Sequence, residues 1–375
     1  MSTVALVTSG AYSVANFRGM LIEELKRRGH RVLALAPDWD DATRRRAGAL
    51  GAEPVDISLS RTGLSPRRDA LDVVRLTATL RRLRPDAVLT YFAKPNVYGM
   101  LAARAAGVKR RVAMVEGLGF VFDSSAGESG RRKLVKLLAR GLYRAAFAGA
   151  HRVVFLNRDD QAFFLAGRLV APGKVVNIGG IGVDLDQFAP APPVTDPPTF
   201  LLMARLLRGK GVLEYAEAAA LVKERHPRAR FVLLGDFDAN PDSLAREDIE
   251  PWVARGAIEW PGHVEDVRGM LAAASAFVLP AWCREGLPRS SQEASAMAKP
   301  VITTDVVGCR DTVEDGRTGL IVRPRDVPDL ARAMTRLIEH PDEIVAMGRE
   351  GRRFAERHYD GREKSRALAD LLVDG

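Results

Sequence analysis

Two carboxylates beside the expected start of a helix carry the clearest chemistry in the sequence. Glu285 and Glu293 lie in REGLPRSSQEASAMAKP, residues 284–300, just after the apolar run 276–280, which predicts a buried strand. Residues 290–298 predict a helix, with Pro288 or Arg289 in its first turn. A helix N-terminus offers backbone N–H groups to an anion, and carboxylates accept hydrogen bonds from hydroxyls. This pattern fits a nucleotide-sugar, whose diphosphate lies between two sets of hydroxyl groups.

The segment also resembles a known family. The spacing of Glu285 and Glu293, with the continuation KPVITTDVVGCRDTVEDGRTGLIV at residues 299–322, is similar to the E-x7-E region of family-4 retaining glycosyltransferases. The resemblance implies that Glu285 orients the hydroxyls of the donor sugar and that Glu293 binds the ribose. It implies further donor contacts in the loop between the two glutamates, at Gly286, Leu287, Pro288 and Arg289.

Basic residues for the diphosphate are expected in ARLLRGKGV, residues 204–212, which follows the predicted strand 199–204. The segment resembles the R-x4-KG element of the family, and two cations near a helix start would neutralise a leaving diphosphate. We therefore expect Arg205 and Lys210 to act with Glu285 as the catalytic set, the alternative being a solvated loop. Donor contacts are also expected at Gly235 and Asp236, which follow the predicted strand 231–234, and at His263 in the segment 258–263, which resembles a base-contacting segment of the family, without a catalytic role for the histidine.

The acceptor site is expected in the first half of the chain, which shows strands at 4–7, 31–36, 87–90 and 112–115. Lys94 and Asn96 follow one strand end, where open α/β sheets bind ligands, and their loop resembles polyprenyl-diphosphate-dependent members of the family. Lys94 could pair with phosphate, whereas Asn96 could simply cap a helix. Glu116 and Gly117 follow the next strand, where many members have histidine or aspartate. Gly10 either lets the donor approach the backbone or only makes a turn.

A basic amphipathic helix is predicted at residues 130–150. Leucines recur at three- and four-residue spacing, and no acidic residue interrupts them. Such a helix can lie on an anionic membrane, the alternative being an ordinary packed helix with a solvated basic face. The basic residues expected to contact the membrane are Arg131, Arg132, Lys133, Lys136, Arg140 and Arg144.

Composition and charge support this division of the chain. Residues 1–190 carry 30 Lys and Arg against 17 Asp and Glu, and residues 191–375 carry 26 against 30, so the first half favours an anionic surface. No nucleic-acid-binding motif accompanies the charge, so we expect lipid and not nucleic acid. Strands alternate with helices in both halves, which predicts an α/β protein with parallel sheets. The resemblance to the family implies the GT-B arrangement, two Rossmann-like parallel-sheet domains facing a cleft. We expect an acceptor domain at 1–188, a proline-rich linker at 189–198, a donor domain at 199–358 and a helix at 359–375 that returns to the first domain.

These features together predict a retaining glycosyltransferase. It would move a sugar, expected to be an N-acetylhexosamine, from a UDP-sugar to a membrane polyprenyl-diphosphate-linked glycan in surface polysaccharide or glycoprotein glycan assembly. No metal ion or other cofactor is expected, and the chain would be peripheral at the cytoplasmic face of the inner membrane. Two alternatives remain, a UDP-N-acetylglucosamine 2-epimerase of the same architecture and a non-catalytic nucleotide-sugar-binding factor of membrane assembly.

Overall fold

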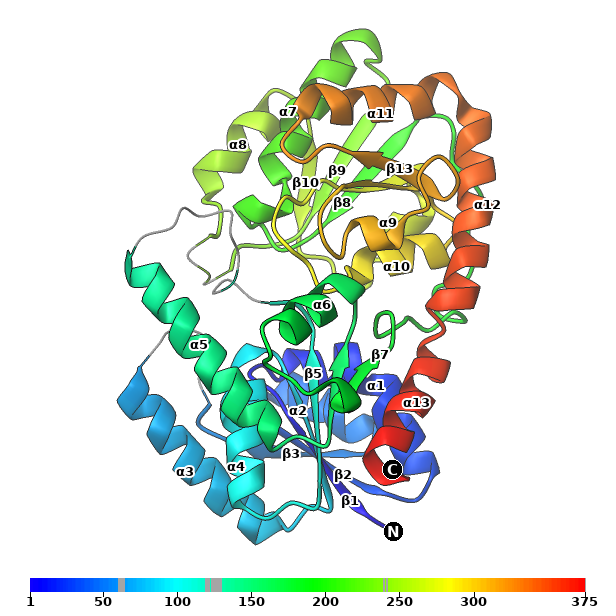
Figure 1. Ribbon diagram of the computed structural model, residues 1–375. Helices are drawn as coiled ribbons and strands as arrows, with labels where there is room; N and C mark the ends of the chain where they lie inside the picture. The colour runs from blue at the N-terminus through cyan, green and yellow to red at the C-terminus, as the bar shows by residue number, and fades with distance from the viewer. Residues whose placement is uncertain (60–64, 119–121, 123–129, 239, 241, 375) are drawn as a thin grey trace. The chain divides into compact units, whose positions relative to one another are not determined.

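The structure is a computed structural model that describes residues 1–59, 65–118, 122, 130–238, 240 and 242–374. The chain forms two compact units, the first made of Met1–Ile181 and Gly361–Gly375 and the second of Gly182–Asp360. Each unit is a parallel β-sheet covered by helices, which Figure 1 shows as two separate sets of arrows. Parallel sheets are buried on both faces, which accounts for the nearly continuous apolar runs of their strands.

The first unit contains a seven-stranded parallel sheet in the order β3-β2-β1-β4-β5-β6-β7. Its strands are β1 (Thr3–Val7), β2 (Arg31–Ala36), β3 (Ala52–Asp56), β4 (Ala87–Tyr91), β5 (Arg110–Val115), β6 (Arg152–Phe155) and β7 (Val175–Asn177). Its helices are α1 (Tyr12–Arg27), α2 (Asp41–Ala49), α3 (Pro66–Leu83), the π-helical turn η1 (Pro95–Gly99), α4 (Met100–Ala105), α5 (Gly130–Ala148), α6 (Arg158–Ala166), the 3-10 turn η2 (Pro172–Lys174) and α13 (Gly361–Val373). The chain changes direction across the sheet between β1 and β4, where ligands bind in folds of this type.

Helices cover the two faces of this sheet in separate groups. Helix α1 packs against α2 and α13, whereas α3, α4, α5 and η1 pack against one another on the opposite face (Figure 1). The last helix, α13, is attached to the first unit by ion pairs from Arg28 to Asp370 and Asp374, at 2.6 and 2.9 Å. The two ends of the described chain therefore belong to the same unit.

The second unit contains a six-stranded parallel sheet in the order β10-β9-β8-β11-β12-β13. Its strands are β8 (Thr199–Met203), β9 (Arg230–Leu234), β10 (Glu259–Gly262), β11 (Ala276–Leu279), β12 (Val301–Thr304) and β13 (Gly319–Val322). Its helices are the 3-10 turn η3 (Arg208–Lys210), α7 (Val212–Arg225), α8 (Arg246–Ala254), α9 (Arg268–Ala272), α10 (Arg289–Ala296), the 3-10 turn η4 (Arg310–Thr312), α11 (Val327–Glu339) and α12 (Pro341–His358). Here the direction changes between β8 and β11, the strands that precede the predicted Arg205 and Glu285.

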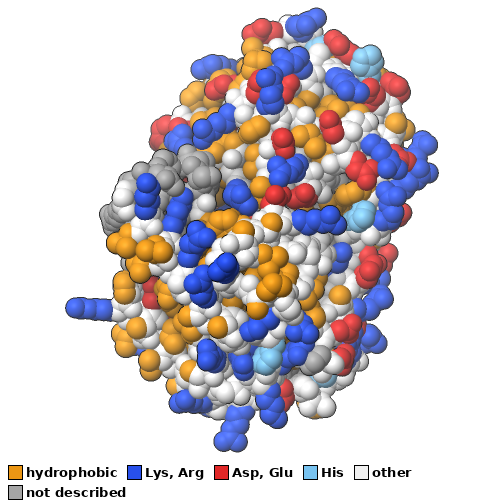
Figure 2. Space-filling view, viewed as in Figure 1, with side chains coloured by type: hydrophobic (Ala, Val, Ile, Leu, Met, Phe, Trp, Pro, Cys, Tyr) orange, Lys and Arg blue, Asp and Glu red, His pale blue; other side chains and the backbone are white. Residues whose placement is uncertain are grey.

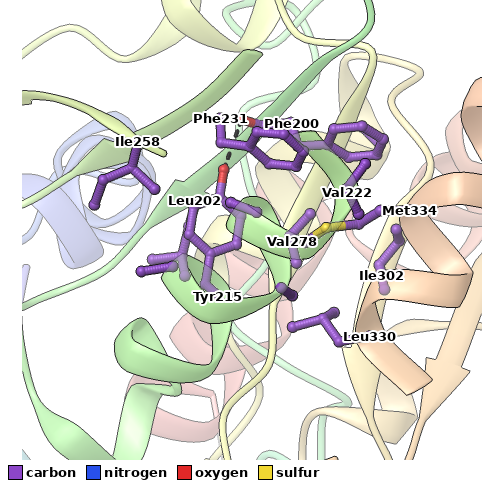
Figure 3. Close-up of a cluster of buried hydrophobic side chains, with 14 of the residues drawn as sticks. Phe200, Leu202, Tyr215, Val222, Phe231, Ile258, Val278, Ile302, Leu330 and Met334 are labelled. Atoms are coloured by element: carbon purple, nitrogen blue, oxygen red, sulfur yellow. Dashed lines mark hydrogen bonds between the residues drawn. The ribbon is translucent and has the colours of Figure 1, made fainter. Parts of the chain in front are cut away.

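Aliphatic side chains and three aromatic ones fill the buried core between this sheet and helices α7 and α11 (Figure 3). The rings of Phe200 and Phe231 stack with their centroids 5.3 Å apart. Tyr215 is fully buried, and its hydroxyl donates to the Phe200 carbonyl at 2.8 Å, so the phenol adds apolar area without an unpaired donor. This core holds strands β8 and β9 rigidly below the loops that follow them.

The boundary between the units differs from the predicted one. It falls after Ile181, not after residue 188, because Val183 and Phe188 are buried in the second unit's core. The proline-rich segment 189–198 is also attached to that unit and is not a free linker. Ala191 N–H donates to the Met297 carbonyl at 3.1 Å, and the buried Lys299 ammonium donates to the Pro192 carbonyl at 2.8 Å. The prolines of segment 189–198 indicate irregular backbone, but they do not indicate which unit the segment packs against.

Candidate active site

The predicted donor residues of the second unit gather at the carboxyl ends of four neighbouring strands. Arg205 follows β8, Gly235 and Asp236 follow β9, His263 follows β10, and the Glu285 loop follows β11. Because the sheet order is β10-β9-β8-β11, these loops are consecutive along one edge. The Gly235 N–H donates to the Gly262 carbonyl at 3.0 Å, which joins two of them. The side chains of Asp236 and His263 are exposed.

An ion pair between Lys210 and Glu285 links the loops after β8 and β11. Both side chains are mostly buried, at 16 and 17% exposed. Burial by itself lowers the pKa of Lys210, but Glu285 more than offsets this, so the pKa is raised and the lysine is charged at neutral pH. The backbone reinforces the link, because the Trp282 and Cys283 N–H groups donate to the Gly209 carbonyl at 2.9 and 3.2 Å. Burial also raises the pKa of the Cys283 thiol well above its usual range, so this cysteine is protonated.

Two glycines allow the close approaches that this site needs. A Cβ on Gly308 would lie 2.3 Å from the Glu285 carbonyl oxygen, and a Cβ on Gly211 would lie 2.1 Å from the Pro280 carbonyl oxygen. Both residues have positive φ, at 82° and 75°, which glycine adopts without strain. Gly308 is a site residue that sequence reasoning missed, since a glycine in VVGC is indistinguishable from an ordinary turn glycine.

The remaining donor residues of this unit also have acidic or basic partners. Pro288 is the N-cap of α10, as the sequence predicts to within one residue, and Glu293 in this helix pairs with Arg289 at 2.8 Å. Burial raises the pKa of Glu293, and Arg289 opposes that rise. Arg205 is half exposed and pairs with Asp238 at 3.0 Å, a partner that sequence reasoning did not include. Arg205 and Glu293 therefore each have a partner of opposite charge.

In the first unit, Lys94 and Asn96 lie at a π-helical turn and not in an irregular loop. Lys94 pairs with the buried Asp69 of α3 at 2.9 Å, and the Tyr98 hydroxyl donates to the same carboxylate at 3.1 Å. Asn96 is only 1% exposed: its amide donates to the Met114 carbonyl at 2.7 Å and accepts from the Thr90 hydroxyl at 2.8 Å. The Asn96 side chain therefore lies inside the turn, hydrogen-bonded to β4 and β5.

Glu116 lies at the end of β5, where it pairs with Arg18 of α1. The carboxylate side chain is 10% exposed and the guanidinium 2%, and Arg18 stacks 4.2 Å from the ring centre of Tyr91. Oε2 of Glu116 has no hydrogen-bond partner among the described residues. Gly117 follows in the same loop, and Gly10 lies after β1, beside Ala11, whose N–H donates to Asp38 at 2.7 Å. Sequence reasoning missed Arg18, although a basic residue among the apolar positions Val14, Leu21 and Leu25 was the available signal.

Helix α5 has its leucine row on the outside. Leu134, Leu137 and Leu138 are 56, 66 and 58% exposed, while Tyr143, Ala146 and Phe147 form the packed face. The basic residues divide: Lys133 is exposed, but Arg144 donates to the Gly167 and Arg168 carbonyls at 3.2 and 3.0 Å, and Arg140 lies over the Phe163 ring. Cations near the last carbonyls of a helix are stabilising, so these two arginines hold α6. The side chains of Arg131 and Arg132 lie outside the described residues.

Within the described part of the chain, no helix is long and apolar enough to cross a membrane. Across the same residues, His, Cys, Asp and Glu side chains form no group of three or more that could hold a metal ion.

Two family models match consecutive parts of the sequence. Residues 16–187 match the model described as Glycosyltransferase Family 4, and residues 197–340 match Glycosyl transferases group 1. A curated relative from Campylobacter jejuni, an N,N'-diacetylbacillosaminyl-diphospho-undecaprenol alpha-1,3-N-acetylgalactosaminyltransferase, is 29% identical over 90% of this chain and 89% of its own length. An Escherichia coli UDP-Gal:alpha-D-GlcNAc-diphosphoundecaprenol alpha-1,3-galactosyltransferase is 28% identical over 72% of this chain and 71% of its own.

Solved structures have the same fold. The Anabaena protein HepE in complex with UDP-glucose superposes with a TM-score of 0.78 at 16% identity, covering all of both chains. Sucrose-phosphate synthase from Thermosynechococcus elongatus superposes with a TM-score of 0.79 at 20% identity, covering 99% of this chain and 98% of its own length. The family models and the curated relatives support glycosyl transfer and not the epimerase or binding-factor alternatives, whereas the solved structures show the fold. With its two parallel sheets of GT-B type, the chain is a glycosyltransferase built from a Glycosyltransferase Family 4 domain and a Glycosyl transferases group 1 domain.

Proposed function

We propose that this glycosyltransferase moves an N-acetylhexosamine from its UDP-sugar to a polyprenyl-diphosphate-linked glycan, with retention of the anomeric configuration. The observation that carries the donor side is the Lys210–Glu285 ion pair beside the start of α10. The pair lies at the point where the sheet changes direction, and this supports a role for its cation toward phosphate and for its carboxylate toward sugar hydroxyls. The Campylobacter jejuni and Escherichia coli relatives, both named for undecaprenol-linked diphosphate substrates, support the acceptor class.

The proposed donor roles follow from charge. Lys210 and Arg205 bind the diphosphate, Glu285 accepts from the hydroxyls of the donor sugar, and Glu293 accepts from the ribose. As the bond from the anomeric carbon to phosphate breaks, negative charge develops on the departing UDP, where fixed cations stabilise it most. The acceptor oxygen attacks from the same face, and its proton passes to the departing phosphate. No side-chain base is required by this proton balance.

The same argument makes transfer independent of a metal ion. Two side-chain cations and the first turn of α10 supply positive charge that a divalent ion supplies elsewhere. Turnover measured in buffer with a chelator should equal turnover with added Mg²⁺ or Mn²⁺. A requirement for added metal would contradict this part of the proposal.

The acceptor is proposed to bind the first unit, at the carboxyl ends of β4 and β5. Lys94 is the candidate cation for its diphosphate, and Glu116 is the candidate acceptor of a sugar hydroxyl. The exposed leucine row of α5 and its basic neighbours support peripheral binding to an anionic membrane at the cytoplasmic face, where such a lipid-linked acceptor would be found.

The donor assignment is tested by thermal unfolding with a panel of UDP-, GDP-, ADP- and dTDP-sugars. A ligand that binds only the native state raises the unfolding midpoint, so a UDP-N-acetylhexosamine should give the largest shift. Arg205→Ala should remove the shift. Arg208→Ala is the matched control, because Arg208 is 48% exposed, close to the 50% of Arg205, but pairs with Asp248 of α8. A shift with GDP- or dTDP-sugars alone would refute the donor, and a shift equal in both variants would refute the role of Arg205.

A further inference from the structure

Helix α3 exposes apolar side chains on a helix whose other face is buried. Leu71 is 54% exposed and Val74 is 66% exposed, whereas Leu76 and Leu80 are buried against the sheet. With Ala78, the exposed residues follow the three- and four-residue spacing of a single helix face. Single exposed leucines are ordinary in proteins, but an aligned pair on one face is the start of a patch.

The charges around these two residues all have the same sign. Within Pro66–Leu83, which is described throughout, both acidic residues are buried and bonded: Asp69 to Lys94, and Asp72 to the Ser58 hydroxyl at 2.6 Å. The exposed charges of the helix are all basic, namely Arg67, Arg68, Arg75, Arg81 and Arg82. The outer surface of α3 is therefore apolar in the middle and positive at its margins.

This surface lies on the same face of the first unit's sheet as α5. Both helices pack against the π-helical turn η1 and against α4 (Figure 1). Among the described residues, ten large hydrophobic side chains are exposed, and six of them belong to these two helices: Leu71, Val74, Leu134, Leu137, Leu138 and Leu142. Figure 2 shows hydrophobic side chains interspersed with Lys and Arg on the surface over these helices. Such a concentration on one face is not expected from scattered surface residues.

We infer that α3 is a second membrane-binding helix, and that Leu71 and Val74 enter the headgroup region of an anionic bilayer together with the leucines of α5. The inference rests on the proposed action on a lipid-linked acceptor. Charge selects the occupant, because an anionic lipid surface complements the arginines whereas a second copy of this chain would bring like charges together. Apolar side chains inserted at the boundary and arginines at the headgroups are the two attractions that hold interfacial helices.

The buried face of α3 connects membrane binding to the acceptor site. Asp69 lies on the buried face of α3, and its carboxylate holds both Lys94 and Tyr98. The helix that rests on lipid thus positions the lysine proposed to bind the acceptor's diphosphate. A lipid-linked diphosphate would meet Lys94 directly behind the membrane-facing surface.

The test is sedimentation of the full chain with vesicles of phosphatidylcholine alone or mixed with an equal part of phosphatidylglycerol. The variant Leu71→Asp with Val74→Asp should bind the anionic vesicles at least about tenfold more weakly than the wild type, because it removes inserted apolar area and adds repelled charge. Leu221→Asp is the matched control: Leu221 is 43% exposed but lies on α7 of the second unit, so its binding should be unchanged. Unfolding midpoints of the variants show that they are folded.

A parallel variant of α5, Leu137→Asp with Leu138→Asp, separates this inference from the proposed function. If the α5 variant loses binding and the α3 variant does not, α3 is not a membrane helix, while peripheral binding through α5 stands. If the wild type itself does not bind anionic vesicles, both the inference about α3 and the proposed membrane binding through α5 fail. If light scattering shows a dimer that the α3 variant dissociates, the face is an interface between copies and the inference is overturned. Donor-induced thermal shifts, unaffected in any of these cases, keep the donor assignment separate.

Discussion

Lys210 and Glu285 neutralise each other at the junction of two strand-end loops, although each was expected to contact a different part of the donor. The pair is mostly buried, so neither charge is well solvated and each depends on the other. A UDP-sugar supplies both a new anion for Lys210 and new hydroxyl donors for Glu285. Binding would thus replace the internal pair by two intermolecular contacts, and the loops are already joined at Gly209.

Replacing Glu285 by Gln should remove most turnover while the protein remains folded. The amide keeps the shape of the side chain but leaves Lys210 without its counter-charge, which should cost about 1–3 kcal/mol, less than the stability of a typical domain. The turnover number with saturating donor should fall about 100- to 1,000-fold, the usual effect of losing one transition-state contact. Kinetics and urea unfolding of the same preparation check both statements. Near-parental turnover would refute the role of Glu285.

Donor affinity should depend on the ionisation of Glu293. Because burial raises the pKa of this carboxyl, it becomes protonated at a higher pH than an exposed glutamate, and a protonated acid accepts hydroxyls less well. UDP affinity should therefore fall as the pH is lowered from neutral to about 5. In Glu293→Gln, affinity should be weaker at neutral pH and nearly constant over this range. If UDP affinity fell with pH equally in the wild type and in Glu293→Gln, the assignment of Glu293 to the ribose would be contradicted. Folding stability should depend on pH in the opposite direction to UDP affinity. A raised carboxyl pKa favours the folded state at low pH, and this contribution to stability is lost as the pH rises through the folded pKa.

Lys299 should make stability rise with pH in the alkaline range. Burial lowers its pKa to about 8, so in the folded protein the lysine loses its proton before it does so in the unfolded chain. Between the folded pKa and the unfolded value of about 10.4, the unfolded chain binds more protons, and the wild type should gain up to about 3 kcal/mol relative to Lys299→Met. Urea unfolding of both proteins over this range measures the difference. If the difference in unfolding free energy between the two proteins stayed constant over this range, the Lys299 ammonium would not be desolvated where it donates to the Pro192 and Ala272 carbonyls.

Removing one partner of the Arg18–Glu116 pair should lower the unfolding free energy strongly, whereas replacing both partners should lower it much less. Arg18→Met leaves Glu116 buried without a counter-charge and should cost about 3–5 kcal/mol of unfolding free energy, whereas adding Glu116→Gln should recover much of it. The exposed pair Arg31–Glu53, 41 and 53% exposed, is the control, and its coupling should be about 1 kcal/mol or less. If double-mutant cycles gave equal coupling energies for Arg18–Glu116 and Arg31–Glu53, burial would not strengthen the Arg18–Glu116 pair.

The regular alternation of apolar strands and helices was predictable because each core strand is buried on both faces. Strand β3 was not predicted, since Pro54 removes a backbone donor, yet β3 lies at the edge of its sheet, where that loss is tolerated. The clustering of the proposed donor residues could be anticipated because parallel strands end at one edge, which brings distant loops together, whereas their identities came from the resemblance to the family. Asp238 as the partner of Arg205, Asp69 as the partner of Lys94 and the close approach at Gly308 follow from side-chain directions and backbone approaches that spacing does not encode. Likewise, α5 was recognised as amphipathic, but only the packed Tyr143 and Phe147 show that its leucines face outward.

Transfer itself tests the central claim. The wild type should be incubated with UDP-N-acetylhexosamine and a short-chain polyprenyl-diphosphate-linked sugar, and the product linkage determined by NMR. The proposal predicts release of UDP and a new α-glycosidic bond, the configuration of the donor. A β-linked product would contradict retention, and an isomerised UDP-sugar without a glycosylated lipid would contradict the proposed transfer.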